Sequence, residues 1–322
     1  MASFFHAGLL ARLACFGVFL QYGVKPPEPS SVLKGHKHTI TCLAFSPNES
    51  LLASGSKDGT VRIWNWQSGK HLTTLEGHLD MVVAVAFAPD GKTLASTSHG
   101  KIITVWNTAG KELYKLAGHD KDVRAVLFTA DGQTLISASA DHTIKIWDLK
   151  ERRSRSTLTG HTAEVNCLAL SRDGKLLASA GWDRTIRLWD PASGKHLADL
   201  EGHTEFVRDL AFTPDGNKLF SCGKDGIIRI WNTKSKKLHS RLEGHKGLVR
   251  SLALSPDGTL LASAGKSGSL KFWDVNTGKL LSSLERGDMS FQVVAFSPDG
   301  KTLASGGIQR QVQLWKVSDL LR

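Results

Sequence analysis

Serine, histidine and aspartate can together form a nucleophile, a general base and an orienting acid, and they recur at fixed spacings along this chain. In the first repeat, His36, Ser54 and Asp58 precede Trp64. Three more repeats contain the same four residue types in the same order: His119, Ser137, Asp141 and Trp147, then His161, Ser179, Asp183 and Trp189, then His203, Ser221, Asp225 and Trp231. An enzyme needs one activated nucleophile beside a cleft, so a copy in repeat after repeat indicates a structural role. We therefore predict no catalytic residue.

Gly-His dipeptides and tryptophans define the repeat. The histidine of Gly-His recurs every 41 or 42 residues: His36, His78, His119, His161, His203 and His245. A tryptophan follows each of these histidines by 28 residues, and a seventh, Trp315, continues the series although Arg286-Gly287 replaces its Gly-His. Self-similarity at such a period is typical of repeat architectures, in which each repeat is one supersecondary unit.

Each repeat has the local pattern of β-structure. Short runs with β-branched residues, such as Val61-Arg62-Ile63-Trp64, alternate with turn residues. Pro-Asp-Gly at 89–91, 214–216, 256–258 and 298–300 predicts tight turns, because proline presets φ and glycine accepts a positive φ. We therefore expect four short strands in each repeat. The residue that is missing between Trp106 and His119 should fall in the connection before the last strand.

The order Gly-His, aspartate in a turn, then Trp-Asp resembles the WD-repeat family over roughly residues 30–316; Trp147-Asp148, Trp189-Asp190 and Trp273-Asp274 carry the full dipeptide. The resemblance implies an all-β, seven-bladed β-propeller of four-stranded antiparallel blades around a central channel. It also implies that the Trp, Ser, His and Asp of a blade form a buried, hydrogen-bonded tetrad that fixes the blade's geometry. The aspartate is replaced in blades two, six and seven, which we expect to be less rigid, blade seven most: Gly100, Ser267 and Gln309.

The two ends of the repeat region are expected to share one blade. The sequence ends at Arg322, soon after Trp315, so no further strand follows in blade seven. Residues 29–34 resemble the segments that precede later Gly-His pairs, and they should complete this blade, which closes the ring and removes its open edges. We therefore divide the chain into a propeller over residues 30–322 and an apolar tail with a proline-rich linker over residues 1–29.

In the WD-repeat family the face of the Gly-His loops is the commoner docking surface. Two positions in each blade should point there. The first lies just after the aliphatic residue that follows Gly-His: Thr41, Val83, Arg124, Asn166, Arg208, Arg250 and Gln292. The second lies just before the aspartate place: Lys57, His99, Ala140, Trp182, Lys224, Lys266 and Ile308. Six of these fourteen residues are lysine or arginine and none is acidic.

The basic members of the two sets, together with two aromatic residues, have the composition of a binding hot spot: Arg124, Arg208, Arg250, Lys57, Lys224, Lys266, Trp182 and Phe206. We therefore expect a non-enzymatic scaffold for protein–protein interactions that binds an acidic peptide or protein here. Asp122 and Glu164 lie near in the sequence and would weaken the positive field. The alternative is a solvated rim without a specific partner.

The formal net charge of +11 raises a second function, the binding of nucleic acid or another anionic surface. Five basic residues two places before tryptophans contribute to this charge: Arg62, Lys145, Arg187, Arg229 and Lys271. They are distributed around the ring, one to a blade, which is a poorer phosphate-binding footprint than a stripe. Nucleic acid is therefore the less favoured partner.

Composition outside the repeats bears on location and cofactors. Residues 7–24 are mostly apolar but are interrupted by Arg12 and Gln21, which disfavours both a signal peptide and a spanning helix. We expect a cytoplasmic, monomeric propeller; membrane attachment or export, if it occurs, would depend on residues 7–24. The four cysteines form no CxxC pair and the histidines no ligand spacing, so no metal or cofactor is expected.

Overall fold

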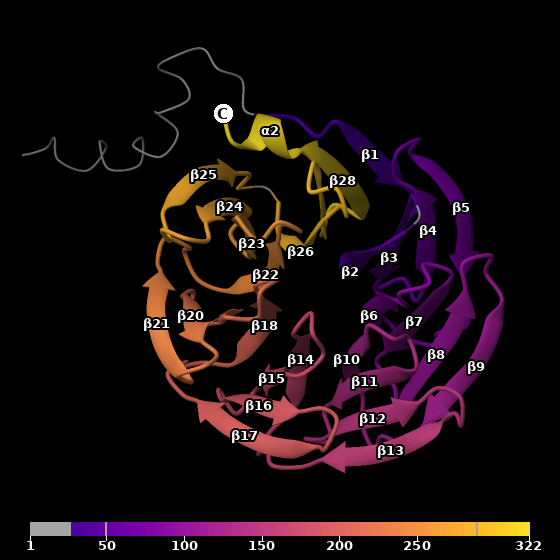
Figure 1. Cartoon of the computed structure of the whole chain (residues 1–322). Coiled ribbons are helices and arrows are strands. Elements are labelled where there is room, and N and C mark those ends of the chain that lie inside the picture. Colours follow the sequence, from indigo (N-terminus) through magenta and orange to yellow (C-terminus); the bar gives the residue numbers. More distant parts are fainter. Residues whose placement is uncertain (1–26, 49, 288) are drawn as a thin grey trace, which may run out of the picture.

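The computed structural model describes residues 27–48, 50–287 and 289–322. The strands in this part of the chain form seven antiparallel sheets of four strands each, arranged in a ring (Figure 1). The predicted seven-bladed propeller is thereby confirmed. The tail proposed for residues 1–29, including the apolar residues 7–24, lies outside the described residues except for 27–29. No helix in the described ranges is long and apolar enough to cross a membrane.

The first strand of each blade lines the centre of the ring and the second packs against it (Figure 1). The first strands are β2 (Ile40–Phe45), β6 (Val82–Phe87), β10 (Val123–Phe128), β14 (Val165–Leu170), β18 (Val207–Phe212), β22 (Val249–Leu254) and β26 (Phe291–Phe296). The second strands are β3 (Leu51–Ser56), β7 (Thr93–Ser98), β11 (Thr134–Ser139), β15 (Leu177–Gly181), β19 (Lys218–Gly223), β23 (Leu260–Gly265) and β27 (Thr302–Gly307).

The third strand carries the repeat tryptophan and the fourth forms the outer edge of the blade. The third strands are β4 (Val61–Asn65), β8 (Ile102–Asn107), β12 (Ile144–Asp148), β16 (Ile186–Asp190), β20 (Ile228–Asn232), β24 (Ser269–Asp274) and β28 (Gln311–Lys316). The fourth strands are β5 (Lys70–Leu75), β9 (Glu112–Ala117), β13 (Arg153–Leu158), β17 (Lys195–Leu200), β21 (Lys237–Leu242), β25 (Leu280–Glu285) and, for blade seven, β1 (Ser31–Lys34).

Blade seven closes the ring as the sequence predicts. β1 pairs antiparallel with β28, and Ser31 lies opposite Leu314. Leu33 and Val312 of this blade pack in one apolar cluster with Ile40 and Trp64 of blade one, so the first and last repeats share a core layer. The short helix α2 (Val317–Leu320) follows β28 and adds its apolar side chains to the core of blades six and seven.

The core is divided into layers between neighbouring blades. In one such layer Val61 and Ile63 of blade one contact Val82 and Trp106 of blade two. Since each tryptophan packs on the preceding blade, every blade needs its neighbour to bury its apolar face. The residue missing from the second repeat lies in the turn between β8 and β9, because Trp106 pairs with Glu112 whereas Trp64 pairs with His71.

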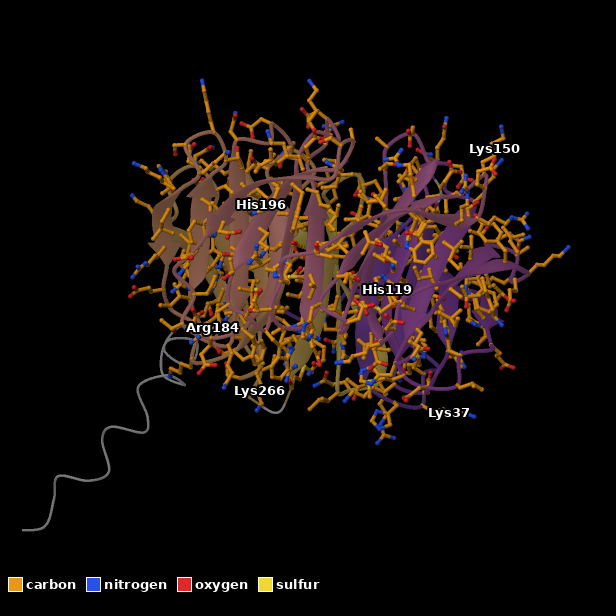
Figure 2. All side chains as sticks on the ribbon, turned by 90° about the horizontal axis from the view of Figure 1, so that it is seen from below. Lys37, His119, Lys150, Arg184, His196 and Lys266 are labelled. Atoms are coloured by element: carbon orange, nitrogen blue, oxygen red, sulfur yellow. The ribbon has the colours of Figure 1, made fainter. Side chains whose placement is uncertain are left out.

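Hairpin direction decides which loops share a face. The Gly-His loops and the aspartate turns lie at one end of the ring, where Figure 2 shows Lys37, Arg184 and Lys266, and Lys150 lies at the other end. We call the first end the Gly-His face.

Candidate functional site

The Ser-His-Asp-Trp sets of blades one, three, four and five form continuous hydrogen-bonded networks. In blade three, Trp147 Nε1 donates to Ser137 Oγ at 2.8 Å, His119 Nε2 lies 2.7 Å from the same oxygen, and His119 Nδ1 lies 2.7 Å from Asp141 Oδ2. A carboxylate only accepts, so Nδ1–H donates to Asp141 and the serine hydroxyl donates to Nε2. The corresponding contacts of blades one, four and five lie between 2.7 and 2.9 Å.

These networks have the bonding order of a hydrolytic triad but not its accessibility. The serine hydroxyls belong to residues that are 0% exposed: Ser54, Ser96, Ser137, Ser179, Ser221, Ser263 and Ser305. No substrate can reach a nucleophile buried in this way, so the networks stabilise the blades and do not support acyl transfer. The described residues also contain no group of three or more His, Cys, Asp or Glu that could hold a metal ion.

The carboxylates are held ionised by their partners. Burial alone would raise the pKa of Asp58, but hydrogen bonds from the Thr60 hydroxyl, the Lys37 amide and His36 lower this pKa to about 2. Sequence reasoning missed this threonine. Its spacing of four residues before the tryptophan, repeated at Thr143 and Thr185, could have revealed it.

The incomplete blades lack parts of the network. In blade two, His78 still contacts Ser96 at 2.7 Å, but Gly100 occupies the aspartate place and has no carboxylate to offer. Burial and then Lys115 lower the pKa of His78 to about 4. In blade six the hydroxyl of Ser269, not Ser267, lies 3.0 Å from His245 Nδ1. Burial and then Lys271 lower the pKa of His245 to about 4.

Blade seven keeps only the contact between Trp315 and Ser305. Gly287 replaces its histidine, and Gln309, in the aspartate place, has a buried Nε2 without a hydrogen-bond partner.

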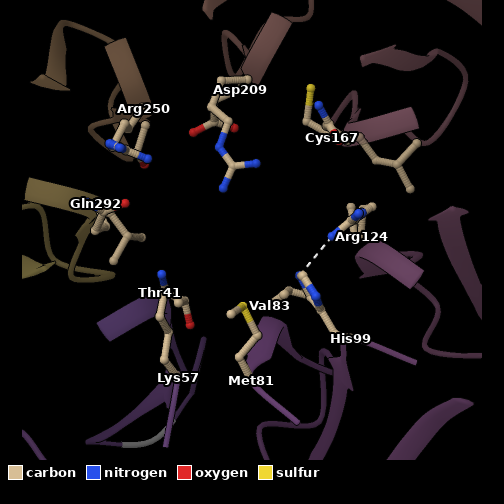
Figure 3. A pocket seen from close by; sticks show the side chains of 16 residues that line it. Thr41, Lys57, Met81, Val83, His99, Arg124, Cys167, Asp209, Arg250 and Gln292 are labelled. Carbon is tan, nitrogen blue, oxygen red and sulfur yellow. Dashed lines mark hydrogen bonds between the residues drawn. The ribbon is translucent and has the colours of Figure 1, made fainter. Parts of the chain in front are cut away.

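A hollow of about 350 Å³ opens at the centre of the Gly-His face (Figure 3). All seven residues of the first predicted set line this hollow: Thr41, Val83, Arg124, Asn166, Arg208, Arg250 and Gln292. The backbone explains their convergence. Each is the extra residue of a β-bulge between the first and second strands of its blade, as Arg208 is between Val207 and Asp209. A bulge re-aims a side chain that regular pairing would direct elsewhere.

The second predicted set divides. Lys57 and His99 also line the hollow. Ala140 is buried and offers no surface there, whereas Ile308 is 48% exposed. Trp182 is 53% exposed and stacks on Phe206, with ring centroids 4.9 Å apart. The stack joins blades four and five on the Gly-His face.

The predicted basic residues are not electrostatically equivalent. Arg124 Nη2 lies 3.0 Å from Glu164 Oε2 and 3.7 Å from Asp122 Oδ2, and Lys224 pairs with Glu205 at 3.2 Å. In the part of the chain that the structure describes, four others have no carboxylate within ion-pair distance: Lys57, Arg208, Arg250 and Lys266. The free positive charge around the hollow therefore comes from Lys57, Arg208 and Arg250.

Asp209, which sequence reasoning did not single out, is the acid in the wall of the hollow. Its Oδ2 accepts from the Leu252 amide of blade six at 2.8 Å, and its Oδ1 from the Leu210 amide at 2.9 Å. Burial raises its pKa to about 6. At the corresponding strand position the other six blades have cysteine, alanine, serine or valine. The single aspartate in this series was the signal available in the sequence.

The fold, the repeated tetrads and the bulged residues that line the central hollow together define a WD-repeat β-propeller. A family model described as the WDR3 first β-propeller domain matches residues 11–190, more than half of the chain. The WD domain, G-beta repeat model matches residues 194–232, 235–274 and 279–316. The chain belongs to the WD-repeat β-propeller family, whose members generally act as interaction scaffolds and are typically non-catalytic.

Curated relatives match over short stretches. Nuclear distribution protein PAC1 of Cryptococcus neoformans is 43% identical over 70 residues, which cover 20% of this chain and 15% of that protein. Nuclear distribution protein nudF 2 of Aspergillus clavatus is 47% identical over 45 residues, or 14% of this chain and 10% of that protein. The matching stretches cover only 15% and 10% of these two relatives, so the similarity that they show is limited to the repeated sequence.

Proposed function

We propose that this protein is a non-enzymatic scaffold that binds an acidic peptide or protein surface on its Gly-His face, at the central hollow. One observation carries the proposal: seven bulged residues, one from each blade, converge on a hollow in which Lys57, Arg208 and Arg250 have no carboxylate partner among the described residues. The acid in its wall, Asp209, is already bonded to two backbone amides. An acidic partner would supply the missing counter-charge.

The aromatic stack gives the same face an apolar anchor. Trp182 has more than half of its surface exposed, and Phe206, its stacking partner, lies two residues before Arg208. An aromatic pair with one exposed ring, beside arginines without an ion-pair partner, has the composition that dominates binding energy in protein interfaces.

Of the five basic residues that stand two places before a tryptophan, three form ion pairs within their own blades. Arg229 pairs with Asp225 at 2.7 Å, Lys271 with Glu285 at 2.9 Å and Arg187 with Asp199 at 3.5 Å. These residues therefore add little to a phosphate-binding footprint.

The test is capture of partners from native lysate by the full chain and by a double variant, Arg208→Glu with Arg250→Glu. Arg124 is left unchanged, because it already pairs with Glu164. The matched control, Arg153→Glu with Arg155→Glu, makes the same charge change on the outer strand β13. Proteins that are lost only with the first variant support docking at the hollow. Proteins that bind all three forms equally would contradict it, and binding of nucleic acid that both variants weaken equally would favour a non-specific charge effect.

A further inference from the structure

A second hollow, of about 410 Å³, lies between blades six and seven at the end of the ring opposite the Gly-His face. The turn between β22 and β23, the turn after β24, the Pro-Asp-Gly turn of blade seven and the helix α2 surround it, and Figure 1 shows α2 beside β28. We call it the α2 hollow. Its wall combines large apolar side chains with three carboxylates: Leu281, Val317, Leu321, Asp257, Asp274 and Asp299.

Two leucines in the wall of the α2 hollow are open to solvent. Leu281 on β25 is 51% exposed, and Leu321 at the end of α2 is 39% exposed. The helix itself is anchored, because Leu320 is 3% exposed and packs in the core of blades six and seven with Leu284. Exposed apolar side chains that share one hollow with a polar rim are typical of an interaction site.

The carboxylates of the α2 hollow are ionised and without a close cation. Asp257, Asp274 and Asp299 make no ion pair with a described residue, and no basic residue is among the described residues that line the hollow. Serine hydroxyls lower the pKa of Asp257 and Asp299, and the Thr277 amide lowers the pKa of Asp274, by hydrogen bonds within their turns. All three groups are therefore negative at neutral pH.

Two lysines outside the hollow act on these carboxylates at longer range. Lys218 attracts Asp274, and Lys301 attracts Asp299. The Lys218 amine donates to the Val275 carbonyl at 3.1 Å, so it is already engaged. Two distant cations against three carboxylates leave the α2 hollow negative, and a cationic partner would complement it.

The corresponding hollow between blades two and three shows what fits beside such a wall. It measures about 260 Å³ and contains the equivalent aspartates of its own blades, Asp90 and Asp131. The guanidinium of Arg152 lies 4.6 Å from the centre of the Tyr114 ring, which lines that hollow. In blade seven, α2 replaces the turn that carries Arg152 in blade three. The aspartates recur from blade to blade, so the open leucines and the missing arginine are what distinguish the α2 hollow.

We propose that the α2 hollow binds an arginine side chain in an extended basic segment of a partner protein. The aliphatic stem of this arginine covers Leu281 and Leu321, while its guanidinium binds carboxylate oxygens at the rim. A lysine fits less well, because its ammonium is a compact charge that cannot form two parallel hydrogen bonds with one carboxylate. A bare metal ion would leave the leucines uncovered, and the described residues hold no group of three or more His, Cys, Asp or Glu arranged for one.

This inference goes beyond the proposed function, because it concerns the other face of the ring and a partner of opposite charge. The two faces together would allow one propeller to hold an acidic partner and a basic partner at the same time.

The experiment uses three immobilised peptide libraries that differ only at a fixed central residue: arginine, lysine, or citrulline, the uncharged analogue of arginine. Retention of the full chain is compared for the wild type and for Asp257→Ser with Asp274→Asn. Asparagine already stands in the place of Asp274 in three other blades, as Asn232 does in blade five. The matched control changes the equivalent pair of blade four, Asp173→Ser with Asp190→Asn, on the same face.

We expect the wild type and the control to prefer the arginine library over the citrulline library by at least about tenfold, and we expect the blade-six variant to lose this preference. Thermal melting checks that each variant is folded.

A second pair of variants tests the apolar wall. Leu281→Ser should reduce retention on the arginine library, whereas Leu72→Ser should not. Leu72 is the matched control because it is 45% exposed at the equivalent place on β5, one residue after the partner of the blade's tryptophan. Equal effects of the two substitutions would overturn the role of the leucine wall.

The remaining outcomes separate this inference from the proposed function. Equal retention of the wild type on arginine and citrulline, or equal losses in the blade-six variant and its blade-four control, would overturn the arginine site. Displacement by free arginine at micromolar concentration would assign the hollow to a small molecule instead of a protein segment. Arg208→Glu with Arg250→Glu should leave retention on the arginine library unchanged, and a loss with that variant would move arginine binding to the Gly-His face. Each of these results leaves the lysate test of acidic docking to stand or fall independently.

Discussion

The tetrad serine is the same residue in all seven blades and is fully buried in each, whereas the bulged residue of the innermost strand takes five different identities around the ring. Both positions are fixed by the same repeat, and the two lie on neighbouring strands. What differs is their surroundings: Ser137 is enclosed by its own blade's tryptophan and histidine, whereas Arg208 faces a hollow shared by every blade. In a repeat protein, a residue that is the same in every unit therefore indicates a requirement for folding. A residue that varies from unit to unit indicates a surface that the assembled ring offers to a partner.

The largest effect expected from breaking a tetrad is in blade five. Arg229 is buried there and contacts Asp225 at 2.7 Å and His203 at 2.8 Å. Asp225→Ala should lower the free energy of unfolding by about 3–5 kcal/mol, because it leaves a buried guanidinium without its counter-ion. Asp141→Ala is the control, since Lys145 of blade three donates outward to Thr157. Its cost should be about 1–3 kcal/mol. Equal losses in urea unfolding would show that Arg229 does not depend on the carboxylate.

Mild acid should distinguish blades two and six from the complete blades. The folded state holds His78 and His245 neutral, with pKa values of about 4, whereas the unfolded chain binds protons near pH 6.5. Unfolding therefore takes up protons, and stability present above pH 6.5 is lost as the pH falls toward 4, by at most about 3 kcal/mol for each histidine.

The measurement is the melting temperature between pH 7.5 and 4 for the wild type and for His78→Gln with His245→Gln. The double variant should be less stable at pH 7.5 and less sensitive to pH. Parallel curves would mean that these two histidines are protonated equally in the folded and unfolded states.

Removal of a serine hydroxyl should cost more in a complete blade than in blade seven. Ser137→Ala leaves two buried groups without a partner, Trp147 and His119, whereas Ser305→Ala leaves only Trp315. Each unsatisfied group costs about 1–3 kcal/mol, so the first variant should lose roughly twice as much stability in urea unfolding.

Amide exchange in the wild type gives an independent measurement of the same difference. It should be faster in β26–β28 than in β10–β13. Uniform protection around the ring would contradict the idea that a complete tetrad makes a blade more rigid.

The fold could be predicted almost completely from the sequence, because the spacing of Trp64 and its counterparts fixes blade number and the segment before Gly35 fixes closure. The position of the bulged residues followed from the same repeat. Which of them carry free charge did not follow, because the contact between Arg124 and Glu164 joins different blades and depends on their packing. The unpaired amide of Asn166 is likewise a property of the assembled hollow.

The smallest effect on stability should accompany the largest effect on binding. Arg208 is exposed and makes no ion pair with a described residue, so Arg208→Gln should change the free energy of unfolding by less than about 0.5 kcal/mol. The substitution removes both the repulsion between Arg208 and Arg250 and the attraction between Arg208 and Asp209, and these two changes oppose each other. Arg124→Gln is the informative comparison, since it breaks an existing ion pair with Glu164 and should destabilise the fold slightly while leaving Arg208 and Arg250 unchanged. A loss of binding with Arg124→Gln that matches the loss with Arg208→Gln would extend the docking surface to blade three.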